Sequence, residues 1–236
     1  MDEPSAVVTL VRAGHIAAGS IALFVAPGAM LTVKGGRWHR RWGRVYVWAM
    51  GVVAVTALAL AAVRPNLFLA LIAVFSFYLA FIGQRTIARR RLPIGRRVTR
   101  LDWGGVMVAG AGAVGLLLYA LLPRGGGRPG LWPVALIFGL LGLLLAGREL
   151  RSFRRPAAEP QAWRYRHMGD MLGAYIATVS AFSVVNFTFL PPIVRWLWPT
   201  AVGVPLIVLW IRYYRRRFPT PAARVGGLVE SRETAA

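Results

Sequence analysis

The chain has three histidines, His15, His39 and His167, and no cysteine. Histidine is a common ligand of metal ions and of haem iron, and it titrates close to neutral pH. The lack of cysteine excludes disulfides, thiolate metal sites, iron–sulfur clusters and cysteine nucleophiles, so redox chemistry would require a bound cofactor. The three imidazoles are therefore the first candidates for chemistry.

Two of the histidines are followed by glycine at helical spacing. Gly19 lies four residues after His15, and Gly43 lies four residues after His39. Residues four apart share one face of a helix, so each imidazole has a bare patch of backbone beside it. A flat macrocycle held by an axial histidine needs such a patch, because a bulky side chain would strike the ring. His167 lacks this glycine.

A haem hypothesis follows from the depth of the histidines. His39 and His167 precede the second and sixth expected membrane spans, so helices starting at similar depth can bring their side chains together. Neighbouring arginines such as Arg40 and Arg166 can pair with haem propionates. We therefore expect one b-type haem held by His39 and His167, with His15 as a third candidate ligand. The plainer alternative is that these histidines bind headgroups and loop carbonyls.

A metal site is a further alternative, because two acidic residues are expected near the same surface. Asp102 opens the fourth span and Asp170 follows His167 by three residues. Together with His39 and His167, these aspartates could hold zinc or a similar ion or pass protons, which would make the protein a metal-dependent membrane enzyme. Alternatively, Asp170 pairs with Arg166 and Asp102 caps its own helix.

The outer half of the bundle offers a second polar region. Asn186 lies deep in the sixth span and needs an interhelical partner, for which His15 is one option. Arg195 lies nearby, whereas Glu149 is expected in an arginine-rich loop where local pairing suffices. This region favours a non-catalytic carrier or a membrane partner subunit, and the chain could also form a homo-oligomer. Whether the protein is an enzyme stays open, because no nucleophile elbow or His-Glu-x-x-His pattern is present.

The composition predicts a membrane protein. Of the 236 residues, 57% are hydrophobic and 16% are charged, whereas soluble domains average about 25% charged. The net charge of +21 is divided among short clusters between apolar stretches. No single domain gathers the basic residues into a face that could follow a phosphate backbone, so we expect no nucleic-acid partner.

Seven apolar stretches are long enough to cross the hydrocarbon layer, if flanking arginines extend to the headgroups. No stretch shows the alternation of a barrel strand, so the predicted fold is all-α. The expected spans are Val7–Thr32, Val45–Val63, Leu67–Gly83, Trp103–Leu122, Leu131–Gly147, Met171–Leu190 and Leu197–Ile211.

The distribution of basic residues predicts the orientation. With these spans, 24 of the 29 lysines and arginines fall on one side and five on the other. The positive-inside rule then places the amino terminus outside and the carboxyl terminus in the cytoplasm, with the arginine clusters on anionic lipids. We expect residues 1–218 to form the transmembrane domain and residues 219–236 a disordered cytoplasmic tail.

The histidine-containing segments resemble a family of bacterial integral membrane proteins grouped as domain of unknown function 2306. The resemblance covers about the first fifty residues and the sixth span. It rests on Gly14-His15, Lys34-Gly35, His39-Arg40, Gly43-Arg44 and Arg166-His167. It implies a multi-pass protein of the bacterial inner membrane in which the three histidines are signature polar positions, and it implies no particular activity.

Overall fold

A computed structural model describes residues 5–90, 98–123, 130–154 and 161–217. These residues form seven α-helices and no strands, and every helix is long and apolar enough to cross a membrane. The helices are α1 (Ala6–Leu31), α2 (Arg37–Val63), α3 (Leu67–Arg90), α4 (Arg100–Leu121), α5 (Trp132–Arg154), α6 (Ala162–Asn186) and α7 (Pro192–Arg217). The chain is therefore an all-α, multi-pass membrane protein, as predicted. The predicted tail lies outside the described residues.

Several helices extend beyond the apolar stretches that predicted them. Helix α2 begins at Arg37 rather than Val45, α3 continues past Gly83 to Arg90, and α6 begins at Ala162. Arginine favours helix almost as well as leucine does, so the arginine-rich flanks continue the helices. The histidines that were expected just before two spans consequently lie inside helices.

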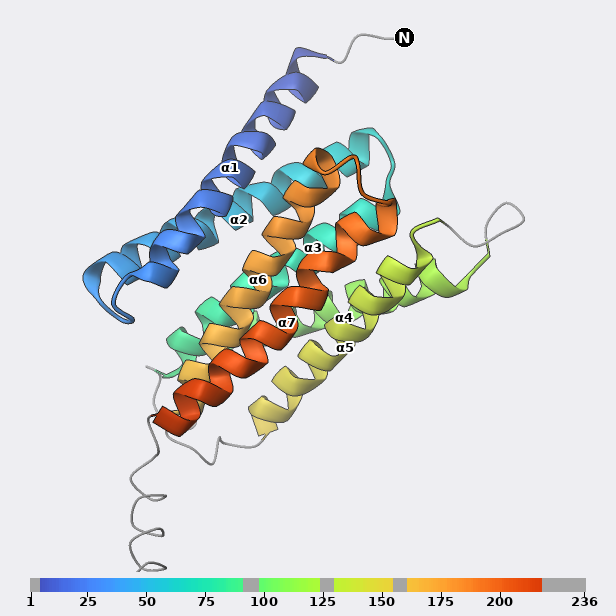
Figure 1. The fold of residues 1–236 in the computed structure, drawn as a ribbon. Helices are drawn as coiled ribbons and strands as arrows, with labels where there is room; N and C mark the ends of the chain where they lie inside the picture. The colour runs from blue at the N-terminus through green and yellow to red at the C-terminus, as the bar shows by residue number, and fades with distance from the viewer. Residues whose placement is uncertain (1–4, 91–97, 124–129, 155–160, 218–236) are drawn as a thin grey trace, which may run out of the picture.

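Helices α3 and α6 occupy the centre of the molecule (Figure 1). On one side they form a ring of four with α1 and α2, in which α1 contacts α2 and α6, and α3 contacts α2 and α6. On the other side, α4 packs on α3, α5 on α4, and α7 on α6. Helices α2 and α6 thus face each other across the ring.

The carboxyl ends of α1, α3, α5 and α7 and the amino ends of α2, α4 and α6 lie at the same end of the bundle (Figure 1). We call this the basic end, because it carries the clusters Arg37–Arg44, Arg85–Arg90, Arg148–Arg154 and Arg212–Arg217. That the basic end faces the cytoplasm stays a prediction of the positive-inside rule.

A tight turn at the basic end joins α1 to α2. Gly35 has a φ of +76°, a left-handed conformation that glycine adopts without strain. The Gly36 amide donates to the Val33 carbonyl at 2.9 Å, and Arg40 donates to the Gly35 carbonyl at 2.6 Å. Lys34 donates to the carbonyl of Met30 in the last turn of α1. The turn therefore satisfies helix-end carbonyls and folds α2 back onto α1.

Small residues bring the helices into close contact. The core of the ring of four contains Ala22, Ala26, Ala80 and Ala174, all at most 5% exposed. Lipid offers no hydrophobic drive for helix association, so close backbone approach through small residues stabilises the bundle instead. On the other side of α3, Ala113 of α4 is buried against α5.

Replacing Gly142 of α5 with alanine is expected to destabilise the bundle by about 1–3 kcal/mol, the usual cost of overpacking. Its new Cβ would lie 2.8 Å from Cβ of Ala113, which is fixed to the backbone of α4. Gly147 on the same helix is the control, since nothing beyond its chain neighbours and its own helix backbone lies within 4 Å of its Cβ position. Thermal unfolding in detergent should show a loss for Gly142→Ala and none for Gly147→Ala; equal behaviour would contradict this packing.

Candidate functional site

Six charged side chains from α3, α4, α5 and α6 form a continuous series of ion pairs at the basic end, which we call the ion chain. Its nitrogen–oxygen distances do not exceed 3.9 Å, and its three carboxylate side chains are each 1% exposed. Acids and bases alternate, so the buried charges balance. In order, the members are Arg85, Asp102, Arg89, Glu149, Arg148 and Asp170.

Asp102 combines helix capping with an ion pair. Its carboxylate accepts from the Thr99 amide at 2.8 Å while its own amide donates to the Thr99 hydroxyl, which is a capping box. Arg85 of α3 donates two hydrogen bonds of 2.8 Å to the same carboxylate. The prediction that Asp102 caps its helix is confirmed, and its main cationic partner comes from a different helix.

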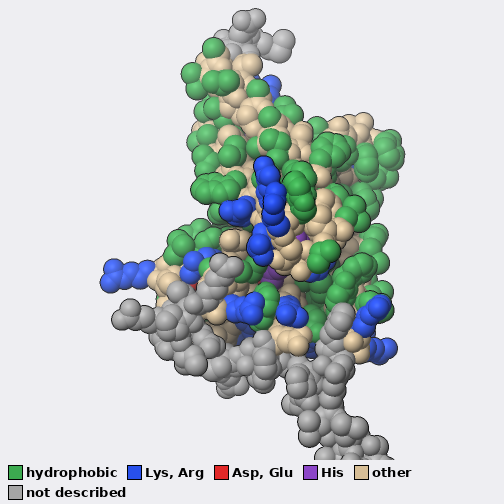
Figure 2. All heavy atoms as spheres, turned by 90° about the vertical axis from the view of Figure 1, so that its left-hand side faces the viewer, with side chains coloured by type: hydrophobic (Ala, Val, Ile, Leu, Met, Phe, Trp, Pro, Cys, Tyr) green, Lys and Arg blue, Asp and Glu red, His purple; other side chains and the backbone are tan. Residues whose placement is uncertain are grey.

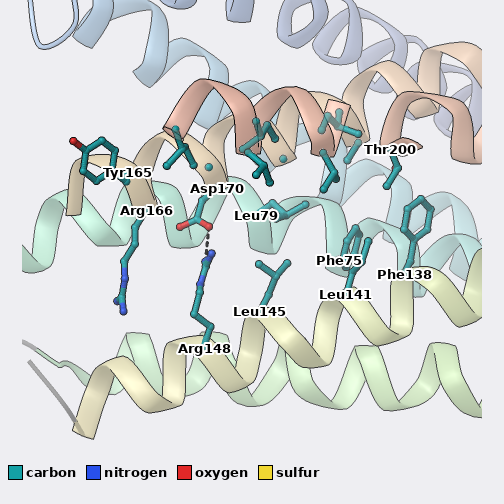
Figure 3. A pocket seen from close by; sticks show the side chains of 18 of the residues that line it. Phe75, Leu79, Phe138, Leu141, Leu145, Arg148, Tyr165, Arg166, Asp170 and Thr200 are labelled. Atoms are coloured by element: carbon teal, nitrogen blue, oxygen red, sulfur yellow. Dashed lines mark hydrogen bonds and ion pairs between the residues drawn. The ribbon is translucent and has the colours of Figure 1, made fainter. Parts of the chain in front are cut away.

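The other two carboxylates also pair between helices. Asp170 accepts from Arg148 of α5 (Figure 3), whereas the sequence favoured Arg166 of its own helix. Glu149, expected in a loop with local partners, lies in α5 and accepts from Arg89 of α3. The expected partner of Asp170 is therefore wrong, and so is the loop position of Glu149, although its neighbour Arg148 does lie 3.9 Å from its carboxylate. A buried carboxylate needs a partner inside the bundle, and neighbouring helices supply it.

The ion chain bears on the proposed metal site. That site required Asp102 and Asp170 to join His39 and His167. Within the described residues, no three histidine, aspartate or glutamate side chains form a group that could hold a metal ion. The two aspartates are bound to arginines of the ion chain instead.

His39 and His167 do come together, at the basic end of the ring of four. Their ring centroids lie 6.3 Å apart and their planes are nearly perpendicular, at 82°. Farther into the membrane, Tyr46 of α2 contacts Thr178 of α6 through a 3.1 Å hydrogen bond. The two histidines therefore meet because α2 and α6 face each other across the ring.

Each imidazole is oriented by a backbone carbonyl from one of the other two helices. Nδ1 of His39 donates to the carbonyl of Ala29 in α1, and Nδ1 of His167 donates to the carbonyl of Gly83 in α3, both at 2.9 Å. A carbonyl only accepts, so Nδ1 carries the proton and Nε2 of the neutral ring keeps its lone pair. In metal-binding histidines, the ring nitrogen that does not bind the metal typically donates such a hydrogen bond.

Ala29 and Gly83 were not found from the sequence. Ala29 lies in the last turn of α1, where carbonyls lack a helical partner and are free to accept. At Gly83 a Cβ would lie 2.7 Å from the sulfur of Met171, so α3 and α6 approach closely there. Every residue has a backbone carbonyl, so the sequence does not indicate which carbonyl accepts from a histidine. The small side chains at both positions are the one sequence feature that could have suggested a close approach.

His15 lies in a different part of α1. Its Nδ1 is 2.9 Å from the hydroxyl of Thr56, which itself donates to the Val52 carbonyl, so the imidazole donates and joins α1 to α2. Fourteen residues of helix separate His15 from Ala29, about 21 Å at 1.5 Å per residue. His15 is therefore too far from the other two histidines to share a ligand with them.

The polar residues expected in the outer half of the bundle do not pair with His15. Asn186 is exposed and donates to the Phe182 carbonyl of its own helix at 2.8 Å. Arg195 donates to the carbonyls of Leu190 and Val184, which closes the end of α6. The expected pairing of Asn186 with the histidine of the first span is wrong, because the amide finds a carbonyl one turn back.

Arg40 and Arg166, which the sequence analysis proposed as partners of haem propionates, lie on different sides of the molecule. Arg40 is exposed at the basic end, next to His39 in sequence. Arg166 instead lines a cavity on the other side of α6 and reaches toward α5 (Figure 3). On the face that carries α1 and α2, histidine lies at the surface among lysine and arginine side chains (Figure 2).

These contacts define a seven-helix membrane protein with a pair of facing histidines at its basic end. The chain matches no protein-family model, no curated protein and no solved structure. The resemblance to domain of unknown function 2306 therefore stays a prediction.

Replacing Glu149 with leucine is expected to destabilise the protein by about 3–5 kcal/mol, because Arg89 and Arg148 lose a buried counter-charge. The double variant Arg89→Leu/Glu149→Leu should lose less than the sum of the two single variants, since it leaves Arg85–Asp102 and Arg148–Asp170 balanced.

Thermal unfolding in detergent measures both effects. The control is Arg151→Leu on the same helix, an exposed position where a change within about 0.5 kcal/mol is expected. Additive losses in the double variant would contradict a coupled ion chain.

Proposed function

We propose that the protein binds one b-type haem between His39 and His167 and serves in electron transfer. The observation that carries the proposal is the facing pair of imidazoles, with centroids 6.3 Å apart and each Nδ1 bound to a carbonyl. His39 and His167 are the residues that would hold the iron of a haem, since each keeps the Nε2 lone pair that such a group binds.

The number of ligands favours haem over zinc. A zinc site takes three or four protein ligands, and the described residues offer two imidazoles with no third histidine or carboxylate beside them. Haem iron receives four nitrogens from its macrocycle, so it needs only two from the protein. Two histidines are therefore a complete ligand set for haem and an incomplete one for a zinc enzyme.

Residues of the chain would orient the two imidazoles, strengthen them as ligands and bind a haem propionate. The carbonyls of Ala29 and Gly83 fix the ring orientations and make Nε2 a stronger ligand. Arg40 is the exposed base that we assign to a propionate. When bound, the haem supplies one-electron chemistry, and two histidine ligands leave no open iron position for oxygen, which favours electron transfer over oxygen activation.

The proposed setting is the bacterial inner membrane with the basic end in the cytoplasm, which rests on the positive-inside rule and the family resemblance. One haem at one end of the bundle does not span the bilayer. An electron-transfer role therefore calls for a redox partner on the same side or within the membrane, either a partner subunit or a second copy of the chain. The alternative function is a non-catalytic carrier or a membrane partner subunit.

The haem proposal is tested by visible spectra of the detergent-purified protein expressed with haem supplied. The wild type is expected to hold about one haem per chain and to show sharp α and β bands after reduction with dithionite, as a six-coordinate iron does. His39→Ala and His167→Ala should each abolish these bands, and the control His15→Ala should retain them. A colourless wild-type protein, or equal loss in all three variants, would refute the proposal.

Replacing Gly43 with leucine tests whether a macrocycle lies beside His39. Apart from its chain neighbours and the backbone of its own helix, nothing lies within 4 Å of a Cβ at Gly43. We therefore expect the apo-protein to accept the side chain, whereas a bound haem should not. Gly14→Leu on α1 is the control, because its Cβ position is equally open and lies far from the histidine pair. We expect haem content to fall only in Gly43→Leu while apo-protein melting stays unchanged in both; unaltered haem content would count against the site.

A further inference from the structure

A second site lies on the other side of α6, between α3, α5, α6 and α7 (Figure 3). Its cavity has a volume of about 600 Å³, which is within the range of small-molecule pockets, roughly 300–1,000 Å³. The lining of α6 extends from Ala162 to Ala177 and that of α7 from Thr200 to Arg215. Each stretch is about 22 Å long at 1.5 Å per residue, so the cavity runs from the basic end into the apolar region.

The walls of the cavity change character along its length. Away from the basic end the lining is apolar, with Phe75 and Leu79 from α3 and Phe138, Leu141 and Leu145 from α5 (Figure 3). Such walls stabilise a hydrocarbon group through dispersion and leave it no hydrogen-bond partners. A long apolar channel of this kind fits an acyl chain.

The basic end of the cavity is positively charged. Arg148 of α5, Arg166 of α6 and Arg215 of α7 all line it, and Asp170 is the acidic residue of the lining. Asp170 balances Arg148 by the ion pair, which leaves Arg166 and Arg215 as an excess of positive charge. Arginine donates in a planar fork that matches phosphate oxygens, so the charge favours a phosphate group.

Among the described residues, two buried polar atoms of the lining lack a hydrogen-bond partner at this end, Nε of Arg148 and Oδ2 of Asp170. The side chain of Asp170 is 1% exposed, and within the described residues its Oδ2 accepts no hydrogen bond. A buried carboxylate oxygen without a donor is costly, and a hydroxyl group beside the phosphate would supply that donor. The headgroup that satisfies both features carries a phosphate and a free hydroxyl, as a phosphoglycerol group does.

We propose that this cavity binds one anionic phospholipid from the leaflet at the basic end. An acyl chain lies along the apolar walls, the phosphate binds Arg166 and Arg215, and a headgroup hydroxyl donates to Asp170. This is a defined site with one lipid per chain, unlike the general attraction of arginine clusters for anionic membranes. It is independent of the haem proposal, because it uses the opposite side of α6.

Native mass spectrometry of the protein, mixed with phosphatidylglycerol or phosphatidylethanolamine of identical chains, tests the site. We expect one phosphatidylglycerol to be retained per chain, and Arg166→Gln/Arg215→Gln to weaken that retention by about tenfold or more. The control Arg216→Gln/Arg217→Gln removes the same charge from exposed positions outside the cavity lining and should retain the lipid. Equal retention of both lipids, or equal loss in both double variants, would overturn the proposal.

Two further experiments test whether the site binds the whole phospholipid or only its headgroup. Thr200→Trp fills the apolar part of the cavity and should abolish lipid retention, whereas Val202→Trp on the exposed side of α7 should not. Free glycerol phosphate should bind far more weakly than phosphatidylglycerol. If glycerol phosphate binds equally well, or Thr200→Trp retains the lipid, a phospholipid is not the ligand. Helical circular dichroism of every variant confirms that a lost lipid does not reflect a lost fold.

Discussion

Burial of three carboxylates inside a membrane bundle is the constraint on which the rest of this structure depends. A charge taken out of water must be paired and hydrogen-bonded, and the ion chain meets that requirement with arginines from α3 and α5. Its links join α3, α4, α5 and α6 and so fix their heights relative to one another. Asp170 follows His167 by three residues in α6, and Arg85 follows Gly83 by two in α3. The same register that pairs the charges brings His167 to its carbonyl partner.

The histidine site is built from residues of four helices. Helices α2 and α6 provide the imidazoles, and α1 and α3 provide the carbonyls that orient them. A site built in this way tolerates little displacement of any helix, because each imidazole depends on a neighbour that is distant in sequence. Placing it on packed helices rather than on loops gives it the rigidity that a ligand pair requires.

Much of the fold could be predicted from the sequence because hydrophobic length is a local property. The seven spans and the all-α class follow from it, and the depth of His39 and His167 follows from the spans. The partners of Glu149 and Asp170 could not be found in this way. Arg89 lies 60 residues from Glu149 and Arg148 lies 22 from Asp170, and composition does not report which helices become neighbours.

The helix ends and the polar partners in the outer half of the bundle also could not be predicted from local sequence. Local rules began the second membrane span at Val45, after His39, because the flank of the span is charged, whereas the helix begins at Arg37, since arginine continues a helix readily. They also offered His15 to Asn186, whereas the structure gives each a partner of its own. Which face a polar residue presents depends on tertiary packing, and one sequence contains that information only indirectly.

The ion chain also implies an order of assembly. Helices enter the membrane from the amino terminus onward, and Arg85 meets Asp102 as soon as α4 follows α3. Arg89 gains its second carboxylate only with α5, and Arg148 gains Asp170 only with α6. Without α6, the ion chain has three arginines and two carboxylates, so one positive charge lacks a counter-charge. Insertion of α6 is thus the event that neutralises the interior and, through His167, completes the facing histidine pair.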